Sequence, residues 1–373
     1  MNVGILGGGQ LARMLAQAGN SLGMESVYFC PESDCPAAPY ARQNQAAYDD
    51  IDAAGKLLDW ADVVTYEFEN IPVPLVRFFE EKGNLYPSSG ALAVSCDRLK
   101  EKTLFNTLGI ETARFAQVDS SDDLAKAVGS IGLPSILKTR SGGYDGKGQS
   151  VLRAPEDVAG AFEELGQVPC ILESMVPFDS ELSVIAARST TGEKVFYPVS
   201  ENHHREGILR LSLSRENSPL QSAAQKMIQK ILDELDYVGV LALELFQVGD
   251  KLYANEMAPR VHNSGHWTIE GACSSQFENH MRAVCGMPLG NVTVDRPTAM
   301  INIIGTLPES GLVKEVPGAV LHLYDKAPRL GRKLGHITLR QTASTAGEHN
   351  NDIIRLLRIC GEEDLACMLS GKE

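Results

Sequence analysis

Two lysines flank a glycine-rich segment near the middle of the chain. Residues 136–152 have the sequence ILKTRSGGYDGKGQSVL, with Lys138 in an apolar, strand-like run and Lys147 among the glycines. Both ammonium groups could contact the phosphates of a nucleotide while the loop closes to exclude water. The segment is not a Walker loop, because Gly148 follows Lys147 where serine or threonine would stand. We therefore predict a nucleotide-phosphate site here; the alternative is an exposed hairpin tip with solvated lysines.

A pair of glutamates about a hundred residues later could bind a cation. Glu244 and Glu256 lie on two apolar runs that meet at Gly249 and Asp250, which predicts a β-hairpin. Two facing carboxylates suit a magnesium ion that also binds nucleotide phosphates. A regular two-residue turn would put the two side chains on opposite faces, so a shared metal requires an odd-length loop or a β-bulge. The alternative is a solvated outer face.

A polar run follows the second glutamate directly. The sequence MAPRVHNSGHWT places five polar side chains within seven residues, namely Arg260, His262, Asn263, Ser264 and His266. A single histidine is usually structural, but such a cluster beside proposed metal ligands is typical of a loop that contacts an anionic substrate.

The chain opens with VGILGGGQLARML, in which an apolar run meets a glycine turn. Gly7, Gly9 and Ala12 fit a dinucleotide-binding fingerprint if alanine takes the third position. That fingerprint also requires an acidic residue about 20 positions further on, where Phe29 and Cys30 stand instead. A nicotinamide-dependent oxidoreductase is therefore disfavoured. The turn remains a general anion site at a helix N-terminus, or a tight turn that binds nothing.

Alternating apolar patterns predict the elements that carry these motifs. Residues up to about 95 form a βαβαβ unit with a parallel sheet, and a helix follows in SCDRLKEKTLFNTLGI. A long helix is predicted after Ser218, with Ser218 as N-cap and Gln221 closing a capping box. Short β-rich runs with Gly and Pro begin near residue 291. We predict domains over 1–97, 98–290 and 291–373.

Composition narrows the class of protein. The 373 residues carry a net charge of −14 and are 43% apolar, which argues for an ordered protein that binds neither nucleic acid nor an anionic membrane. The eight cysteines include no C-x-x-C pair, so reduced thiols are expected rather than zinc or disulfides. We find no secretion signal and no apolar run of membrane-spanning length, and we expect a cytoplasmic location.

Several motifs together resemble a known family. They are GILGGGQLARM, TYEFENIP, DRLKEK, LKTRSGGYDGKGQ, NEMAPRVHNSGHWT and GRKLGH. This set resembles the ATP-grasp superfamily and, within it, the 5-(carboxyamino)imidazole ribonucleotide synthases of purine biosynthesis. The resemblance implies an α/β and α+β chain with an ATP-grasp fold, a Rossmann-like N-terminal parallel-sheet domain and a small β-rich C-terminal domain, usually as a homodimer.

The resemblance also implies a reaction. ATP would phosphorylate bicarbonate to carboxyphosphate, and the amine of aminoimidazole ribonucleotide would capture the carboxyl group, with magnesium or manganese as the metal. The alternative within the fold is a ligase that acts on a different purine-pathway ribotide. A noncatalytic nucleotide sensor is a further alternative, which would be favoured if Glu244 and Glu256 were dispensable.

The resemblance assigns expected roles to individual residues. Those expected to bind ATP are Arg98, Lys138, Gly143, Tyr144, Asp145, Gly146, Lys147, Gly148, Gln149, Glu173, Ser174, Met175, Val176, Glu181, His204, Asn255 and Glu256. Those expected to bind the ribotide or carboxyphosphate are Gly8, Gly9, Gln10, Tyr144, Asp145, Arg260, His262, Asn263, Ser264, Lys326, Arg332 and Lys333. The expected metal ligands are Glu244 and Glu256, and the expected catalytic residues are Asp145, Lys147, Arg260 and His262.

Two positions depart from the family pattern. Ala12 stands where glycine is usual, and Asp325 replaces a usual glycine before Lys326. The first substitution still allows a tight turn, whereas the second affects how Lys326 is placed. Either Asp145 or His262 could accept the proton that the amine loses.

Overall fold

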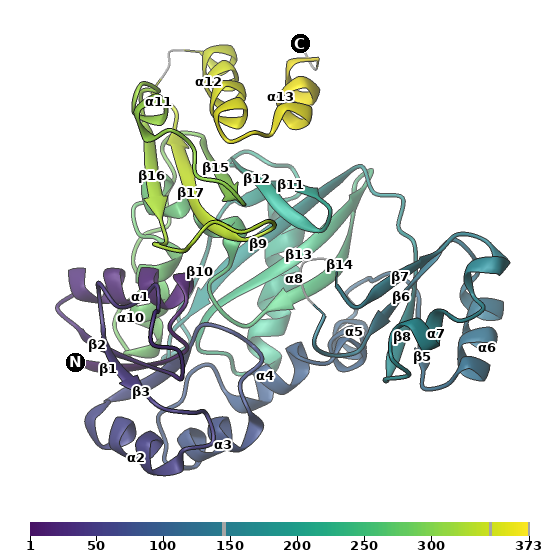
Figure 1. Cartoon of the computed structure of the whole chain (residues 1–373), viewed down its shortest axis with the longest axis horizontal. Coiled ribbons are helices and arrows are strands. Elements are labelled where there is room, and N and C mark those ends of the chain that lie inside the picture. The colour runs from purple at the N-terminus through teal and green to yellow at the C-terminus, as the bar shows by residue number, and fades with distance from the viewer. Residues whose placement is uncertain (144–146, 343–344, 372–373) are drawn as a thin grey trace.

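The N-terminal part is a small parallel sheet covered by helices. A computed structural model describes residues 1–143, 147–342 and 345–371, and Figure 1 shows the whole chain. The sheet has the order β3-β2-β1-β4 with parallel pairs throughout. Its elements are β1 (Asn2–Leu6), α1 (Gln10–Ser21), β2 (Glu25–Cys30), β3 (Arg42–Gln45), α2 (Ile51–Trp60) and β4 (Val63–Tyr66). The predicted βαβαβ unit is confirmed, and the polar edge strand β3 is an addition to it.

Helices lead from this sheet to a second, antiparallel one. They are α3 (Val73–Glu81), α4 (Ser89–Ser95) and α5 (Arg98–Thr107). The second sheet has the order β5-β8-β6-β7 and forms the separate lobe at the right of Figure 1. Its elements are β5 (Phe115–Val118), α6 (Ser121–Ile131), β6 (Ser135–Thr139), β7 (Gln149–Leu152), a 3₁₀ turn (Pro155–Asp157), α7 (Ala161–Glu164) and β8 (Cys170–Ser174). The lysine-flanked segment connects β6 to β7, as predicted.

A nine-stranded antiparallel sheet forms the centre of the molecule. Its order is β14-β13-β9-β11-β12-β15-β17-β16, with β10 beside β9. The strands are β9 (Ser180–Arg188), β10 (Lys194–Phe196), β11 (Val199–Arg205), β12 (Ile208–Arg215), β13 (Gly239–Val248), β14 (Lys251–Ala258), β15 (Thr298–Ile304), β16 (Ala319–Leu323) and β17 (Lys333–Arg340). Because β12 pairs with β15, the C-terminal strands extend the central sheet across the predicted boundary at residue 290.

The remaining helices cover this sheet. They are α8 (Gln221–Glu234), a 3₁₀ turn (Asn263–Gly265), α9 (Thr268–Gly271), α10 (Gln276–Val284), α11 (Ser310–Lys314), α12 (Ala346–Ile359) and α13 (Glu363–Ser370). The predicted capping box of α8 is wrong, since Leu220 is the N-cap residue and makes no side-chain cap. The side chain of Gln221 instead bonds the backbone of Val199 and Tyr197. Tertiary hydrogen bonds to the neighbouring strand thus replace the local motif.

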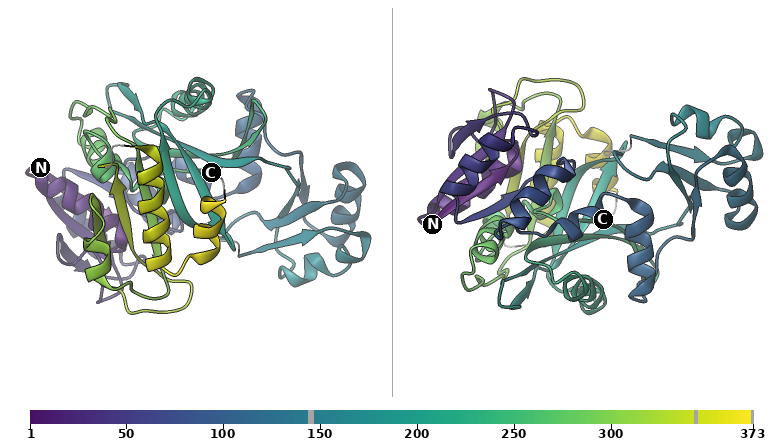
Figure 2. Two further views of the ribbon diagram at one scale, coloured as in Figure 1. Left: turned by 90° about the horizontal axis from the view of Figure 1, so that it is seen from above. Right: turned by 90° about the horizontal axis from the view of Figure 1, so that it is seen from below.

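The three parts of the chain share one hydrophobic core. One cluster contains Met14 and Tyr28 from the N-terminal part, Trp267 and Met281 from the segment after β14, and Tyr324 from the segment after β16. Figure 2 shows these parts stacked together, while the lobe of β5–β8 projects to one side. Such close packing fixes the positions of the three parts relative to one another.

Candidate active site

A cavity of about 780 Å³ is lined by all the motifs singled out in the sequence. Its walls come from the β1–α1 turn, the end of β4, α5, the β6–β7 connection, the β13–β14 hairpin, the segment after β14 and the start of β17. The predicted site residues that line it are Gly9, Gln10, Arg98, Lys138, Gly143, Lys147, Gln149, Glu181, His204, Glu244, Asn255, Glu256, Arg260, His262, Asn263 and Lys333. Tertiary folding therefore brings positions more than 300 residues apart into one site.

Other predicted residues do not line the cavity. They are Gly8, Gly148, Glu173, Ser174, Met175, Val176, Ser264, Lys326 and Arg332. Tyr144, Asp145 and Gly146 lie outside the described residues. Lys326 is adjacent to the wall, because its ammonium donates to the side-chain oxygen of Gln10.

Ser264 requires a correction, because it is fully buried behind the cavity wall. Its hydroxyl accepts a hydrogen bond from Ser183 (2.7 Å) and lies 2.9 Å from Nδ1 of His262. The side chain of Ser264 therefore contacts His262 and does not reach the cavity, where direct substrate contact was expected. The reason is the 3₁₀ turn over Asn263–Gly265, which turns this side chain toward the central sheet.

The β13–β14 hairpin contains the bulge that facing glutamates require. Gly249 and Asp250 form a two-residue turn, and the strand register shifts between Glu244 and Leu245. Asn255 is the extra residue, so Glu244 lies directly opposite Glu256 on one face. A regular hairpin would have separated the two carboxylates.

The electrostatic surroundings of the two glutamates differ. Burial and the neighbouring Glu256 raise the pKa of Glu244 to about 7. Although burial opposes it, the Arg98 guanidinium lowers the pKa of Glu256, to which it is paired at 2.8 Å. Asp97 caps α5 by accepting from the backbone N–H of Leu99, which places Arg98 in the first turn. This oxygen-donor pair fits a hard divalent cation, which would relieve the repulsion between the carboxylates.

Arg260 and His262 continue the same wall. Arg260 is paired with Glu69 at 2.8 Å and donates to the carbonyl oxygen of Val261, while its buried Nε has no partner among the described residues. Burial, followed by the positive charges of Arg260 and Lys333, holds the pKa of His262 well below its usual range. The imidazole is therefore neutral near pH 7.

The glycine turn at the N-terminus of α1 is already occupied by a carboxylate of the chain. Glu67 accepts hydrogen bonds from the backbone N–H groups of Gly9 and Ala12. Because β4 lies parallel to β1, the residue that follows β4 reaches the helix N-terminus beside it. The general anion site expected at this helix N-terminus is thus filled by a side chain of the same chain. No sequence pattern signalled Glu67 or Glu69, although both lie in the TYEFENIP motif.

A buried ion cluster lies behind the cavity wall that contains Lys138. The Glu173 carboxylate lies 3.0 Å from Nζ of Lys138 and 3.5 Å from Nζ of Lys102. Although burial opposes it, the two lysines lower the pKa of Glu173 to about 2. Lys102 is fully buried and was not predicted, because one lysine on an amphipathic helix gives no signal. Glu173 thereby positions Lys138 at the wall.

Two aromatic rings offer a flat apolar surface in the same half of the cavity. Phe178 and Phe246 stack with ring centroids 4.7 Å apart and an interplanar angle of 7°. Both line the cavity, and such a surface suits the plane of a purine base. Neither residue was identified from the sequence, since a single aromatic residue in a loop (Phe178) or in a strand (Phe246) gives no signal of a binding site.

Removing the buried ammonium should test this cluster. Lys102→Met is expected to lower the free energy of unfolding by up to about 3–5 kcal/mol, because it breaks a buried ion pair. Urea unfolding measures this loss. The KM for ATP should also rise, because Glu173, which pairs with both Lys102 and Lys138, is no longer held by Lys102. Lys100→Met on the exposed face of α5 is the control and should change neither quantity. Equal stability of the two variants would contradict the structural role of Lys102.

Models of known protein families match three segments of the chain. Residues 1–96 match the model described as "Ribonucleotide synthetase preATP-grasp domain", and residues 103–277 match "ATP-grasp domain". Residues 298–349 match "Phosphoribosylaminoimidazole carboxylase C-terminal domain". The fold and the cavity therefore define an ATP-grasp ligase, with the small N-terminal and C-terminal domains that the resemblance implied.

Individual relatives narrow the family. The chain is 51% identical to the N5-carboxyaminoimidazole ribonucleotide synthase of Pseudomonas aeruginosa, over 91% of this chain and 94% of that protein. Its structure is similar to the corresponding synthetase of Thermus thermophilus, with a TM-score of 0.91, 48% identity and coverage of 96% and 98%. It also matches the Aspergillus clavatus synthase in complex with ADP and 5-aminoimidazole ribonucleotide, with a TM-score of 0.88, 30% identity and coverage of 96% and 98%. The chain belongs to the N5-carboxyaminoimidazole ribonucleotide synthase family.

Proposed function

We propose that this chain uses ATP and bicarbonate to carboxylate 5-aminoimidazole ribonucleotide in de novo purine biosynthesis. The products are N5-carboxyaminoimidazole ribonucleotide, ADP and phosphate, and carboxyphosphate is the intermediate. One observation carries this proposal beyond family membership. A single cavity is lined by the lysine and arginine side chains suited to nucleotide phosphates and by the facing glutamates. Arg260 and His262 line the same cavity. Such an arrangement brings a phosphorylated carboxyl donor and its acceptor together, which supplies much of the rate.

The nucleotide occupies the half of the cavity next to the β5–β8 lobe in this proposal. Arg98, Lys138 and Lys147 bind its phosphates, and Glu181 holds the ribose hydroxyls. His204 lies 3.1 Å from Glu181 and helps to position that carboxylate. Residues 173–176 do not line the cavity, whereas the stacked rings of Phe178 and Phe246 do. We therefore assign adenine stacking to these rings and keep the backbone of residues 173–176 as the hinge that the resemblance implies.

Magnesium is the metal that the donor set suits best, with manganese as an alternative. Glu244 and Glu256 would hold it, and Asn255 stands beside them on the bulge. When bound, the ion supplies charge neutralisation for the phosphoryl group that ATP transfers. The ion pair between Arg98 and Glu256 keeps that carboxylate ionised for this role.

The ribotide and carboxyphosphate occupy the other half in this proposal. The guanidinium of Arg260, held by Glu69, offers two donors to carboxyphosphate. The ribotide is then surrounded by Gln10, Lys326 and Lys333, with Arg332 directly before Lys333 in the chain. Either His262, which is neutral near pH 7, or Asp145 takes the proton from the exocyclic amine.

Other expectations remain proposals. The proposed domain boundaries at residues 97 and 290 agree with family matches over 1–96, 103–277 and 298–349. Within the described ranges, no helix is both long and apolar enough to cross a lipid bilayer. The homodimer follows from the resemblance alone, and sedimentation equilibrium of the purified chain tests it. The cytoplasmic location rests on the cysteine content and on the absence of a secretion signal or a membrane-spanning apolar run in the sequence.

The decisive experiment measures ADP release with each substrate omitted in turn. We expect release to require both aminoimidazole ribonucleotide and bicarbonate, because the cavity couples phosphoryl transfer to capture of the carboxyl group. Release that proceeds equally without the ribotide would contradict this assignment. Release driven by a different purine-pathway ribotide would instead support the alternative ligase.

The pH dependence of ribotide binding provides a separate prediction. Burial, together with the charges of Arg332 and Lys333, lowers the pKa of Lys326 to about 8. The ammonium is present below this pH and lost above it, so the KM for the ribotide should rise as pH increases through 8. Lys326→Arg should remove this rise, because arginine stays charged. An identical pH profile in both proteins would exclude Lys326 from phosphate binding.

A further inference from the structure

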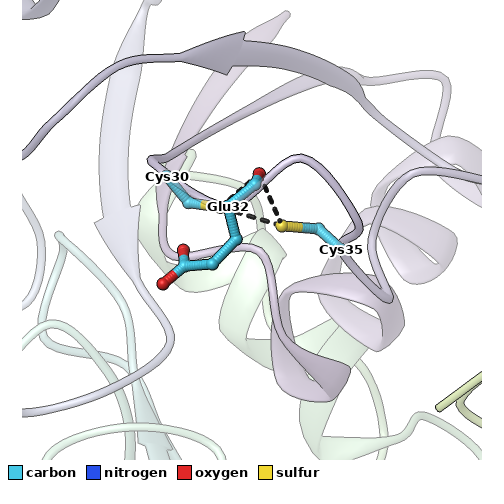
Figure 3. Close-up of side chains that lie close together, drawn as sticks. All are labelled: Cys30, Glu32 and Cys35. Carbon is cyan, nitrogen blue, oxygen red and sulfur yellow. Dashed lines mark hydrogen bonds between the residues drawn. The ribbon is translucent and has the colours of Figure 1, made fainter. Parts of the chain in front are cut away.

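Two cysteines lie in contact beside the glycine turn. Cys30 ends β2 and Cys35 follows five residues later, with the Sγ atoms 2.8 Å apart. Figure 3 shows the pair and the connecting loop. Each sulfur also lies 3.4–3.5 Å from the backbone carbonyl oxygen of Glu32. Both thiols are buried, whereas residues 31–34 between them are exposed. The proposed reaction uses neither thiol.

We propose that Cys30 and Cys35 form a site of reversible oxidation, at which a peroxide converts the dithiol to a disulfide. The sulfur of Cys35 attacks a peroxide oxygen, which gives a sulfenic acid and releases one water. The sulfur of Cys30 then displaces the hydroxyl as a second water and forms the S–S bond. Two thiol hydrogens leave, and hydrogen peroxide is reduced to two molecules of water.

The geometry requires little movement for this bond. A disulfide has its sulfurs about 2.05 Å apart, so the two Sγ atoms must approach by less than about 1 Å from their present 2.8 Å. Burial raises the pKa of both thiols, and a small thiolate fraction makes the oxidation slow. The site therefore responds to sustained oxidation rather than to a brief pulse.

A metal ion is the competing occupant. Among the described residues, the carboxylate of Glu32 is the one further side-chain ligand close to both sulfurs. A structural zinc site needs four protein ligands, and this cluster offers three. Zinc binding by the reduced pair is therefore treated as an outcome that would overturn the proposal.

The dithiol is connected to the cavity wall. A side-chain carbon placed on Gly8 would lie 2.8 Å from Sγ of Cys35, and the backbone N–H of Ala37 donates to the carbonyl oxygen of Gly8 (3.1 Å). Gly8 precedes Gly9 and Gln10, which line the cavity. Closing the disulfide shifts the sulfur of Cys35, which packs against this turn, so oxidation should disturb the ribotide half of the cavity.

A second connection runs through Arg13. Its guanidinium donates to the carbonyl oxygen of Pro36 (3.0 Å) and to Asp325 (2.7 Å). Asp325 precedes Lys326, which bonds Gln10. The segment after Cys35 is thus tied to two groups that we assign to the ribotide, and this coupling rests on the proposed function.

The first test is chemical and independent of activity. Replacing the exposed Cys273 and Cys367 by serine leaves six of the eight thiols. Hydrogen peroxide should then lower the titratable thiol count of the full chain from six to four, with a mass loss of two hydrogens in the peptide that spans residues 30–35. Adding Cys35→Ser should abolish this linkage. A linkage elsewhere, or stoichiometric zinc binding that blocks it, would overturn the proposal.

The second test measures coupling to the cavity. In the same background, oxidation should raise the KM for aminoimidazole ribonucleotide about fivefold or more, leave the KM for ATP unchanged, and be reversed by dithiothreitol. The Cys30→Ser protein should not respond. A disulfide that forms without changing the ribotide KM would overturn the coupling. Failure of the proposed function would appear separately, as absent carboxylation in reduced protein whose thiols still pair.

Discussion

Glu256→Gln is expected to lower kcat on the order of a thousandfold, since a catalytic metal supplies several kcal/mol. The glutamine amide keeps the size of the side chain but loses the charge that faces Glu244 and pairs with Arg98. Steady-state ADP release at saturating ATP measures the effect, and circular dichroism checks the fold. Excess magnesium should restore little activity, because the remaining amide oxygen is uncharged and binds a divalent cation more weakly than a carboxylate.

The matched control for this variant is Glu278→Gln. Glu278 is also a half-buried carboxylate paired with an arginine, Arg282, at 2.7 Å. It lies on α10 and does not line the cavity, so its loss should leave kcat within about twofold of the parent, as surface pairs contribute little. Near-normal turnover of Glu256→Gln would remove this residue from the metal site.

Arg260→Lys is expected to lower kcat on the order of a hundredfold to a thousandfold, the range seen when one preorganised donor is removed. Lysine keeps the charge but loses the planar fork, so it cannot contact Glu69 and a carboxyphosphate oxygen together. The KM for ATP should change little, because Arg260 lies in the ribotide half of the proposed site. Single-turnover measurement of ribotide carboxylation separates the two effects.

Arg188→Lys is the control for this change. Arg188 pairs with Asp236 at 2.5 Å and donates to the carbonyl oxygen of Tyr237, which resembles the two-partner contact of Arg260. It lies outside the cavity, so it should affect stability rather than turnover. Equal kcat losses in both variants would indicate a general loss of folding and would contradict the proposed role of Arg260.

The hairpin of Glu244 and Glu256 shows how far the sequence could predict the site. The apolar runs and the turn at Gly249 and Asp250 predicted both strands, because strand periodicity and turn chemistry are local properties. The facing of the two carboxylates depended on whether a bulge was present. The bulge at Asn255 depends on how the strands pair in the folded sheet. No local sequence pattern predicts it.

The glycine turn shows what the sequence could not predict about this site. Its sequence predicted a helix N-terminus able to bind an anion, and the structure places Glu67 there. The occupant comes from a strand that is distant in the sequence, so only the packing of β4 beside β1 could identify it. Ser264 is a similar case: its type suited substrate contact, but its burial depends on how the chain turns after Arg260.

The sequence by itself determined the order of the elements, the positions of the motifs and the family, because these follow from local patterns of residues. Tertiary structure alone decided which of those residues meet. Pairing of Lys102 with Glu173, of Arg260 with Glu69 and of Cys30 with Cys35 depends on distances of a few ångströms. Such distances are set by the packing of the whole core, which a linear pattern does not specify.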